Sequence, residues 1–132
     1  MPTLFQPGLT DDSGSVTSIG PTDLEGYSDS LIVPGLLFPL QQLTITIVVG
    51  YINGGASPSI TFSIDQLTGD GPTQKWTSIW SSGAISAPGT TGPTIVNPPG
   101  GANAFDPPVL RLSWVTTGQP TQVDFTPNLQ AA

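Results

Sequence analysis

The residues in this sequence that could carry acid–base chemistry are its aspartates, because the chain contains no histidine and no cysteine. Two carboxylates at a suitable separation are enough for glycoside hydrolysis. The candidates in the strand-rich part are Asp65, Asp70, Asp106 and Asp124. Asp70 and Asp106 lie in turn sequences, where aspartate commonly binds local backbone groups, whereas Asp65 ends an expected strand and Asp124 faces outward on another. These positions favour structural roles, and we expect no catalytic residue.

The residue types also argue against most other catalytic sites and against metal-binding sites. Without histidine and cysteine, the usual general base, thiol nucleophiles and most zinc sites are missing. The sequence "DQLTGDG" places Asp65 and Asp70 five residues apart but lacks the ligand spacing of an EF-hand calcium loop. Arg111 lies within an expected strand, on the face opposite Leu110 and Leu112, so a solvated or partly paired role is expected. We therefore expect no enzyme activity, no cofactor and no metal ion.

Trp76 and Trp80 are the remaining candidates for a binding site. Both belong to "KWTSIWSS", and their even spacing places them on one face of a regular strand. Such a face could stack sugar rings, as in a carbohydrate-binding module. Alternatively, the two rings fill a sandwich core or a subunit interface, since tryptophan buries a large area. The sequence favours the second interpretation.

The composition indicates what kind of scaffold positions these residues. The chain has 132 residues, enough for one domain with its own core. Charged residues make up only 8%, while 16 glycines and 15 prolines interrupt helices. Threonine, which is frequent here, suits a pleated surface. No helical period persists for more than a turn, so the composition predicts an all-β protein with long loops.

Alternating apolar and polar residues predict roughly seven to nine short strands. The strongest covers residues 40–51, and further strands are expected at residues 29–33, 59–65, 75–82, 84–86, 94–96, 109–117 and 121–127. The inward-facing residues are expected to be Leu43, Ile45, Ile47, Val49, Ile60, Phe62, Ile64, Leu110, Leu112, Trp114, Val123 and Phe125. Asn53-Gly54-Gly55 predicts a tight hairpin, because Asn-Gly readily adopts positive φ angles. Residues 27–132 are therefore expected to form an antiparallel β-sandwich or jelly roll.

Residues 1–26 differ from this part and are expected to form an extended N-terminal arm. They hold four acidic residues and few apolar ones. The arm is either a frayed terminus or a segment that docks on a partner, with an apolar anchor and a short added strand at residues 16–19. The candidate contact residues for the second interpretation are Leu4, Phe5, Leu9, Val16 and Ile19.

The charge balance bears on the partners of the chain. Lys75 and Arg111 are its two basic residues, and the net charge is −7. Nucleic-acid backbones and anionic membranes both attract clustered basic residues, so we expect neither as a partner. The N-terminus lacks the basic and apolar regions of a signal peptide. The apolar run at residues 31–40 contains two prolines and a glycine, and it is too short to span a bilayer.

Two stretches, "GGASPSITFSIDQLTGDGPTQKWTSIW" and "PPVLRLSWVTTGQPTQVDFT", resemble small β-sandwich structural proteins of tailed bacteriophages. The matching features are Ser57-Pro58, Asp70-Gly71, Trp76, Arg111 with Trp114, and the turn from Gly118 to Pro120. The resemblance covers roughly residues 40–127. It implies a virion component, either a capsid decoration (cement) protein or a minor tail protein.

The resemblance leads us to expect a non-enzymatic protein on the outer surface of the phage head, bound to the major capsid protein. A homotrimer is expected, since closed rotational symmetry is common and capsids offer local threefold sites. A tail or baseplate component is the first alternative, and the copy number per particle distinguishes it from a head protein. The second is a carbohydrate-binding module that uses Trp76 and Trp80, for which a glycan array is the test.

Overall fold

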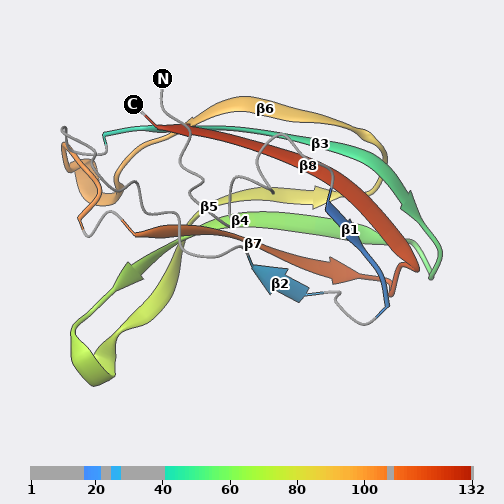
Figure 1. Cartoon of the computed structure of the whole chain (residues 1–132), viewed down its shortest axis with the longest axis horizontal. Helices are drawn as coiled ribbons and strands as arrows, with labels where there is room; N and C mark the ends of the chain where they lie inside the picture. The colour runs from blue at the N-terminus through green and yellow to red at the C-terminus, as the bar shows by residue number, and fades with distance from the viewer. Residues whose placement is uncertain (1–16, 22–24, 28–40, 107–108, 132) are drawn as a thin grey trace.

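The computed structural model describes residues 17–21, 25–27, 41–106 and 109–131, which form two antiparallel sheets packed face to face (Figure 1). The elements in chain order are β1 (Thr17–Ile19), β2 (Glu25–Tyr27), β3 (Leu43–Asn53), β4 (Ser59–Thr68), η1 (Gly71–Thr73), β5 (Lys75–Ile85), β6 (Gly89–Val96), η2 (Pro99–Gly101), β7 (Leu110–Thr117) and β8 (Gln122–Ala131). Sheet A has the strand order β1-β8-β3-β6, and sheet B has the order β2-β7-β4-β5. The predicted all-β sandwich is confirmed.

The strands pair in a nested order. β1 pairs with β8, β2 with β7, β3 with β6, and β4 with β5. The chain therefore follows the path of one long hairpin that has been rolled over itself. β3 also pairs with β8, and β4 with β7, which joins the four ladders into two sheets. This is the topology of a jelly roll, the more specific of the two sandwich forms expected from the sequence.

Alternate residues of the long strands form the core between the sheets. The inward residues that are at most 1% exposed include Leu43, Ile45, Ile47, Val49, Ile60, Ile64, Leu110, Leu112 and Leu129. Phe62 from sheet B meets Phe125 from sheet A edge to face, with ring centroids 4.8 Å apart. Trp114 contacts the same Phe125 ring at 5.3 Å. The alternation read from the sequence therefore identified the inward residues of β3, β4 and β7 correctly, but it did not single out Val96, Phe105 and Leu129, which are also buried in the core.

The turn at residues 53–55 is not a hairpin, contrary to the sequence prediction. β3 belongs to sheet A and β4 to sheet B, so the chain crosses between the sheets here. The crossing from β7 to β8 lies against it: the N–H of Ala56 donates to the carbonyl of Gly118, and the N–H of Thr121 donates to that of Asn53, both at 2.9 Å. The prediction failed because an Asn-Gly turn fixes local backbone shape but not the sheet that each strand joins.

β4 and β5 do form a hairpin, which projects from the body of the sandwich (Figure 1). Its tip contains η1. The Thr73 hydroxyl donates to the carbonyl of Asp70 at 2.7 Å, and it accepts the N–H of Asp70 at 3.1 Å. Asp70 therefore lies in a turn, as the sequence predicts, but the side chain that makes these hydrogen bonds is that of Thr73.

The outer strands of the two sheets are irregular or short. β5 has two register shifts against β4, and β6 has one against β3 and contains Pro93. At the opposite side, β1 has three residues and pairs only with residues 123–125 of β8. The next residues of β8 include Pro127, which has no N–H to donate.

β1 and β2 are part of the sandwich, which corrects the expected role of Ile19. β1 pairs with β8 so that Ile19 lies opposite Val123, and Ile19 is 3% exposed within the core. A side chain buried there is not available to contact a capsid. β2 runs across position 26, the expected end of the arm. Leu4, Phe5, Leu9, Val16 and the strand expected at residues 29–33 lie outside the described residues.

Candidate functional site

The aspartates of the long strands do not form a catalytic pair. Asp65 lies on β4 and Asp124 on β8, and each points outward from its own sheet. The two carboxylates therefore lie on opposite outer faces of the sandwich, with the core between them. Asp70 lies at the tip of the β4–β5 hairpin, and Asp106 lies in the connection between β6 and β7.

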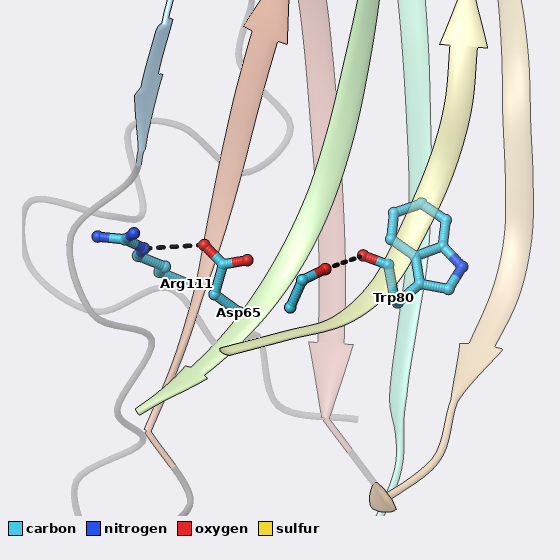
Figure 2. Close-up of polar contacts among 4 residues, drawn as sticks. Asp65, Trp80 and Arg111 are labelled. Atoms are coloured by element: carbon cyan, nitrogen blue, oxygen red, sulfur yellow. Dashed lines mark hydrogen bonds and ion pairs between the residues drawn. The ribbon is translucent and has the colours of Figure 1, made fainter. Parts of the chain in front are cut away.

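Asp65 instead forms an ion pair with Arg111, which lies opposite it on β7. The Nε of Arg111 donates to Oδ2 of Asp65 at 3.0 Å, and the two side chains are 18% and 10% exposed (Figure 2). The guanidinium carbon of Arg111 also lies 4.4 Å from the ring centroid of Trp76, close enough for a cation–π contact. These contacts link β7, β4 and β5 across the outer face of sheet B. The sequence expectation of a partly paired Arg111 is confirmed.

The two tryptophans of β5 lie on opposite faces of the sheet, which corrects the prediction that they share one. In the ladder between β4 and β5, Trp80 lies opposite Ile64 and Ser78 lies opposite Asp65. Ile79 therefore has no partner on β4 and is an additional residue in β5. Such a β-bulge exchanges the faces of all side chains on one side of it. Trp76 consequently points outward.

The environments of the two rings agree with this register. Trp80 is partly buried and packs against the hydrophobic core, whereas Trp76 stacks with Arg111 outside sheet B. The Ser78 hydroxyl bridges the bulge by donating to the carbonyl of Trp80 at 3.4 Å, and Figure 2 shows the Trp80 ring well apart from the Asp65–Arg111 pair. These two residues cannot form one flat platform for a sugar ring.

Among the titratable residues that the structure describes, Asp124 has the clearest change in its environment. Its carboxylate accepts hydrogen bonds from Nε2 of Gln122 at 3.0 and 3.2 Å and from the hydroxyl of Ser18 at 2.7 Å. The bonds from Gln122, and then that from Ser18, lower the pKa of Asp124 below its ordinary value of 3.8. Because Ser18 belongs to β1, the charged carboxylate ties β1 to β8.

We expect this attachment of β1 to weaken in acid. A pKa that is lower in the folded state adds stability above about pH 3.8, and this is lost as the pH falls through the folded value. Hydrogen exchange at the backbone amides of β1 that are protected at neutral pH, corrected for intrinsic rates, should lose this protection as the pH falls below about 3.8. Asp124→Asn, which cannot ionise, should remove the pH dependence. An unchanged acid profile in this variant would show that another group holds β1.

A pocket of about 440 Å³ lies at the end of the ladder between β3 and β6. Its lining residues are Gln41, Gln42, Asn97, Pro98, Gly101, Ala102 and Asn103. Gln42 directly precedes Leu43 and Asn97 directly follows Val96, and those two inner residues are partners in the ladder. Sequence reasoning missed this group because isolated amides next to prolines and glycines form no recognisable motif. Gln41 and Gln42 were assigned to the strand expected at residues 40–51, whereas Asn97 and Asn103 follow the strand expected at residues 94–96, and nothing in the sequence connects the two groups.

Two further features, a cluster of metal ligands and a membrane-spanning helix, are not found among the described residues. Within residues 17–21, 25–27, 41–106 and 109–131, no three His, Cys, Asp or Glu side chains come together as metal ligands would. In the same part of the chain, no helix is long and apolar enough to cross a membrane.

Comparison of the chain with protein-family models, curated proteins and solved structures finds no match. The function therefore has to be inferred from the residues and geometry of the chain itself.

Proposed function

We propose that this protein is a non-enzymatic structural component of a tailed-phage virion, a decoration (cement) protein that binds the outer surface of the head. Its partner is the major capsid protein, and it binds there as a homotrimer. Each copy binds the assembled shell in preference to free subunits, so that many copies stabilise the shell even if each contributes little.

The observation that carries this proposal is the outer surface of sheet A over β3 and β6, which we call the β3–β6 face. Its outward residues include Thr44, Thr46, Val48, Thr90 and Ile95, none of them charged. Val48 is 40% and Ile95 is 55% exposed, although both are large and apolar. Covering such a face removes apolar area from water without desolvating a charge. We infer from these two exposed apolar side chains on an uncharged face that the β3–β6 face is the contact surface.

The fold and the placement of the charged residues support the same proposal. Jelly rolls occur in viral capsid proteins as well as in lectins and cupins, although a fold alone does not define a function. The paired charges described above stabilise structure: Asp65 binds Arg111, and Asp124 holds β1. A broad neutral face on a rigid scaffold is better suited to adhesion than to turnover.

Substitution of Ile95 by lysine tests the proposal. Ile95→Lys should reduce binding to heads assembled from the phage's own capsid protein by at least about tenfold, because an unpaired ammonium group would be buried at the contact. Val115→Lys is the matched control, since Val115 is 42% exposed on the outer face of sheet B. Bound copies are counted after co-sedimentation with undecorated heads.

Three outcomes would contradict the proposal. Equal binding by both variants and the wild type would exclude the β3–β6 face as the contact. A failure of wild-type protein to bind heads would exclude the head as its location. A few copies per purified particle, in place of hundreds, would assign the protein to the tail or baseplate.

A further inference from the structure

The amide-lined pocket is built on three segments that are each anchored in the core. Leu43, next to Gln42, is fully buried, and Val96, next to Asn97, is 4% exposed. The third segment contains Asn103 and is fixed two residues later by Phe105, whose side chain is 3% exposed. Figure 1 shows the start of β3, the end of β6 and η2 together at one end of the sandwich. The position of each segment is therefore set before any ligand arrives.

Four side-chain amides of this pocket keep their hydrogen-bonding capacity available. Those of Gln41, Gln42, Asn97 and Asn103 make no hydrogen bond to another group in the described part of the chain, and all four residues are exposed. Each carboxamide offers two donors and two acceptors. Together they present both kinds of group around one cavity, beside the buried ring of Pro98.

We propose that this pocket binds a neutral saccharide. None of its lining residues in the described part of the chain is charged, so no side chain named there would pair with an ionic ligand. The net charge of −7 further disfavours anions. A sugar hydroxyl both donates and accepts, which matches the planar amides. The pocket of about 440 Å³ lies within the usual range of small-ligand sites, about 300–1,000 Å³. The site is separate from Trp76 and does not depend on the proposed virion role.

The test is a titration of the isotope-labelled full chain, followed by two-dimensional NMR of its side-chain amide groups. The probes are maltohexaose, cellohexaose and N-acetylchitohexaose, each added to millimolar concentration, with a sialylated oligosaccharide as the charged comparison. At least one neutral probe should shift the NH₂ signals of Asn97 and Asn103 in a saturable way. The double substitution Asn97→Ala with Asn103→Ala should weaken that binding about tenfold or more, because two hydrogen bonds are lost.

The matched control is Asn128→Ala, which removes an exposed amide from β8, away from the pocket lining. It should leave the affinity unchanged. The proposal is overturned if no neutral probe shifts the pocket amides, if the double variant binds as well as the wild type, or if the charged oligosaccharide binds as tightly as the neutral ones. Amide spectra of both variants should retain the dispersion of the folded protein, since the replaced residues are exposed.

Discussion

Replacing Gly118 by alanine should destabilise the protein by about 2–5 kcal/mol, measured as the free energy of unfolding in urea. Gly118 has a φ of +75° in the crossing from β7 to β8, and a Cβ there would lie 2.3 Å from the carbonyl oxygen of Ala56. The left-handed conformation costs alanine about 1–2 kcal/mol, and the steric overlap adds about 1–3 kcal/mol. The opposing atom belongs to the backbone of the connection between β3 and β4, so the contact can be relieved only by moving that connection.

Gly83→Ala separates these two contributions. Gly83 has a nearly identical φ of +74°, but a Cβ there would meet nothing within 4 Å. It should therefore lose only the conformational part, about 1–2 kcal/mol. Equal losses in the two variants would show that the crossings are not in the close contact described here.

The substitution Phe62→Ala should cost about 3–5 kcal/mol, a large share of the roughly 5–15 kcal/mol that stabilise a typical domain. The Phe62 ring is fully buried and packs edge to face on Phe125, so its removal leaves a cavity at the junction of the sheets. The backbone N–H of Phe62 donates to the hydroxyl of Ser82 at 3.0 Å, a bond that the substitution does not remove. The measurement is again unfolding in urea.

Val115→Ala provides the comparison for a truncation outside the core. Val115 is 42% exposed on sheet B, and its loss should change the free energy of unfolding by at most about 0.5 kcal/mol. If Phe62→Ala were equally mild, the sheets would not be held together at the aromatic contact.

The sequence was sufficient to predict the strands β3, β4 and β7 and their inward faces, because these depend on local alternation. The inward residues of β3 and β4 were correct for this reason, from Leu43 to Val49 and from Ile60 to Ile64. It was wrong about the next part of the chain, where the strands expected at residues 75–82 and 84–86 are one strand, β5, and where β6 begins at Gly89 instead of residue 94.

The turn that precedes a strand did not predict which of the two sheets that strand joins. The glycines after Asn53 adopt positive φ in the structure, as a hairpin would require, yet the next strand lies in the other sheet.

The side-chain contacts on sheet B were harder to predict, because they depend on the register in which the strands pair. Asp65 and Arg111 are 46 positions apart, and they meet only because β4 and β7 pair in one particular alignment. The bulge at Ile79 has a similar origin, since it is defined by the strand opposite. A regular period applied to β5 therefore placed Trp76 and Trp80 on one face, although a single additional residue separates them.

The irregular outer strands bear on the proposed decoration role, in which many copies would lie close together on one shell. Exposed strands can template pairing between molecules and so initiate insoluble aggregates. Register shifts in β5, Pro93 in β6 and Pro127 in β8 each interrupt the row of donors that such growth requires. The net charge of −7 adds repulsion between copies, since nine of the eleven charged residues are acidic. The interrupted outer strands and this net charge would together allow copies to lie close to one another and remain folded as separate units.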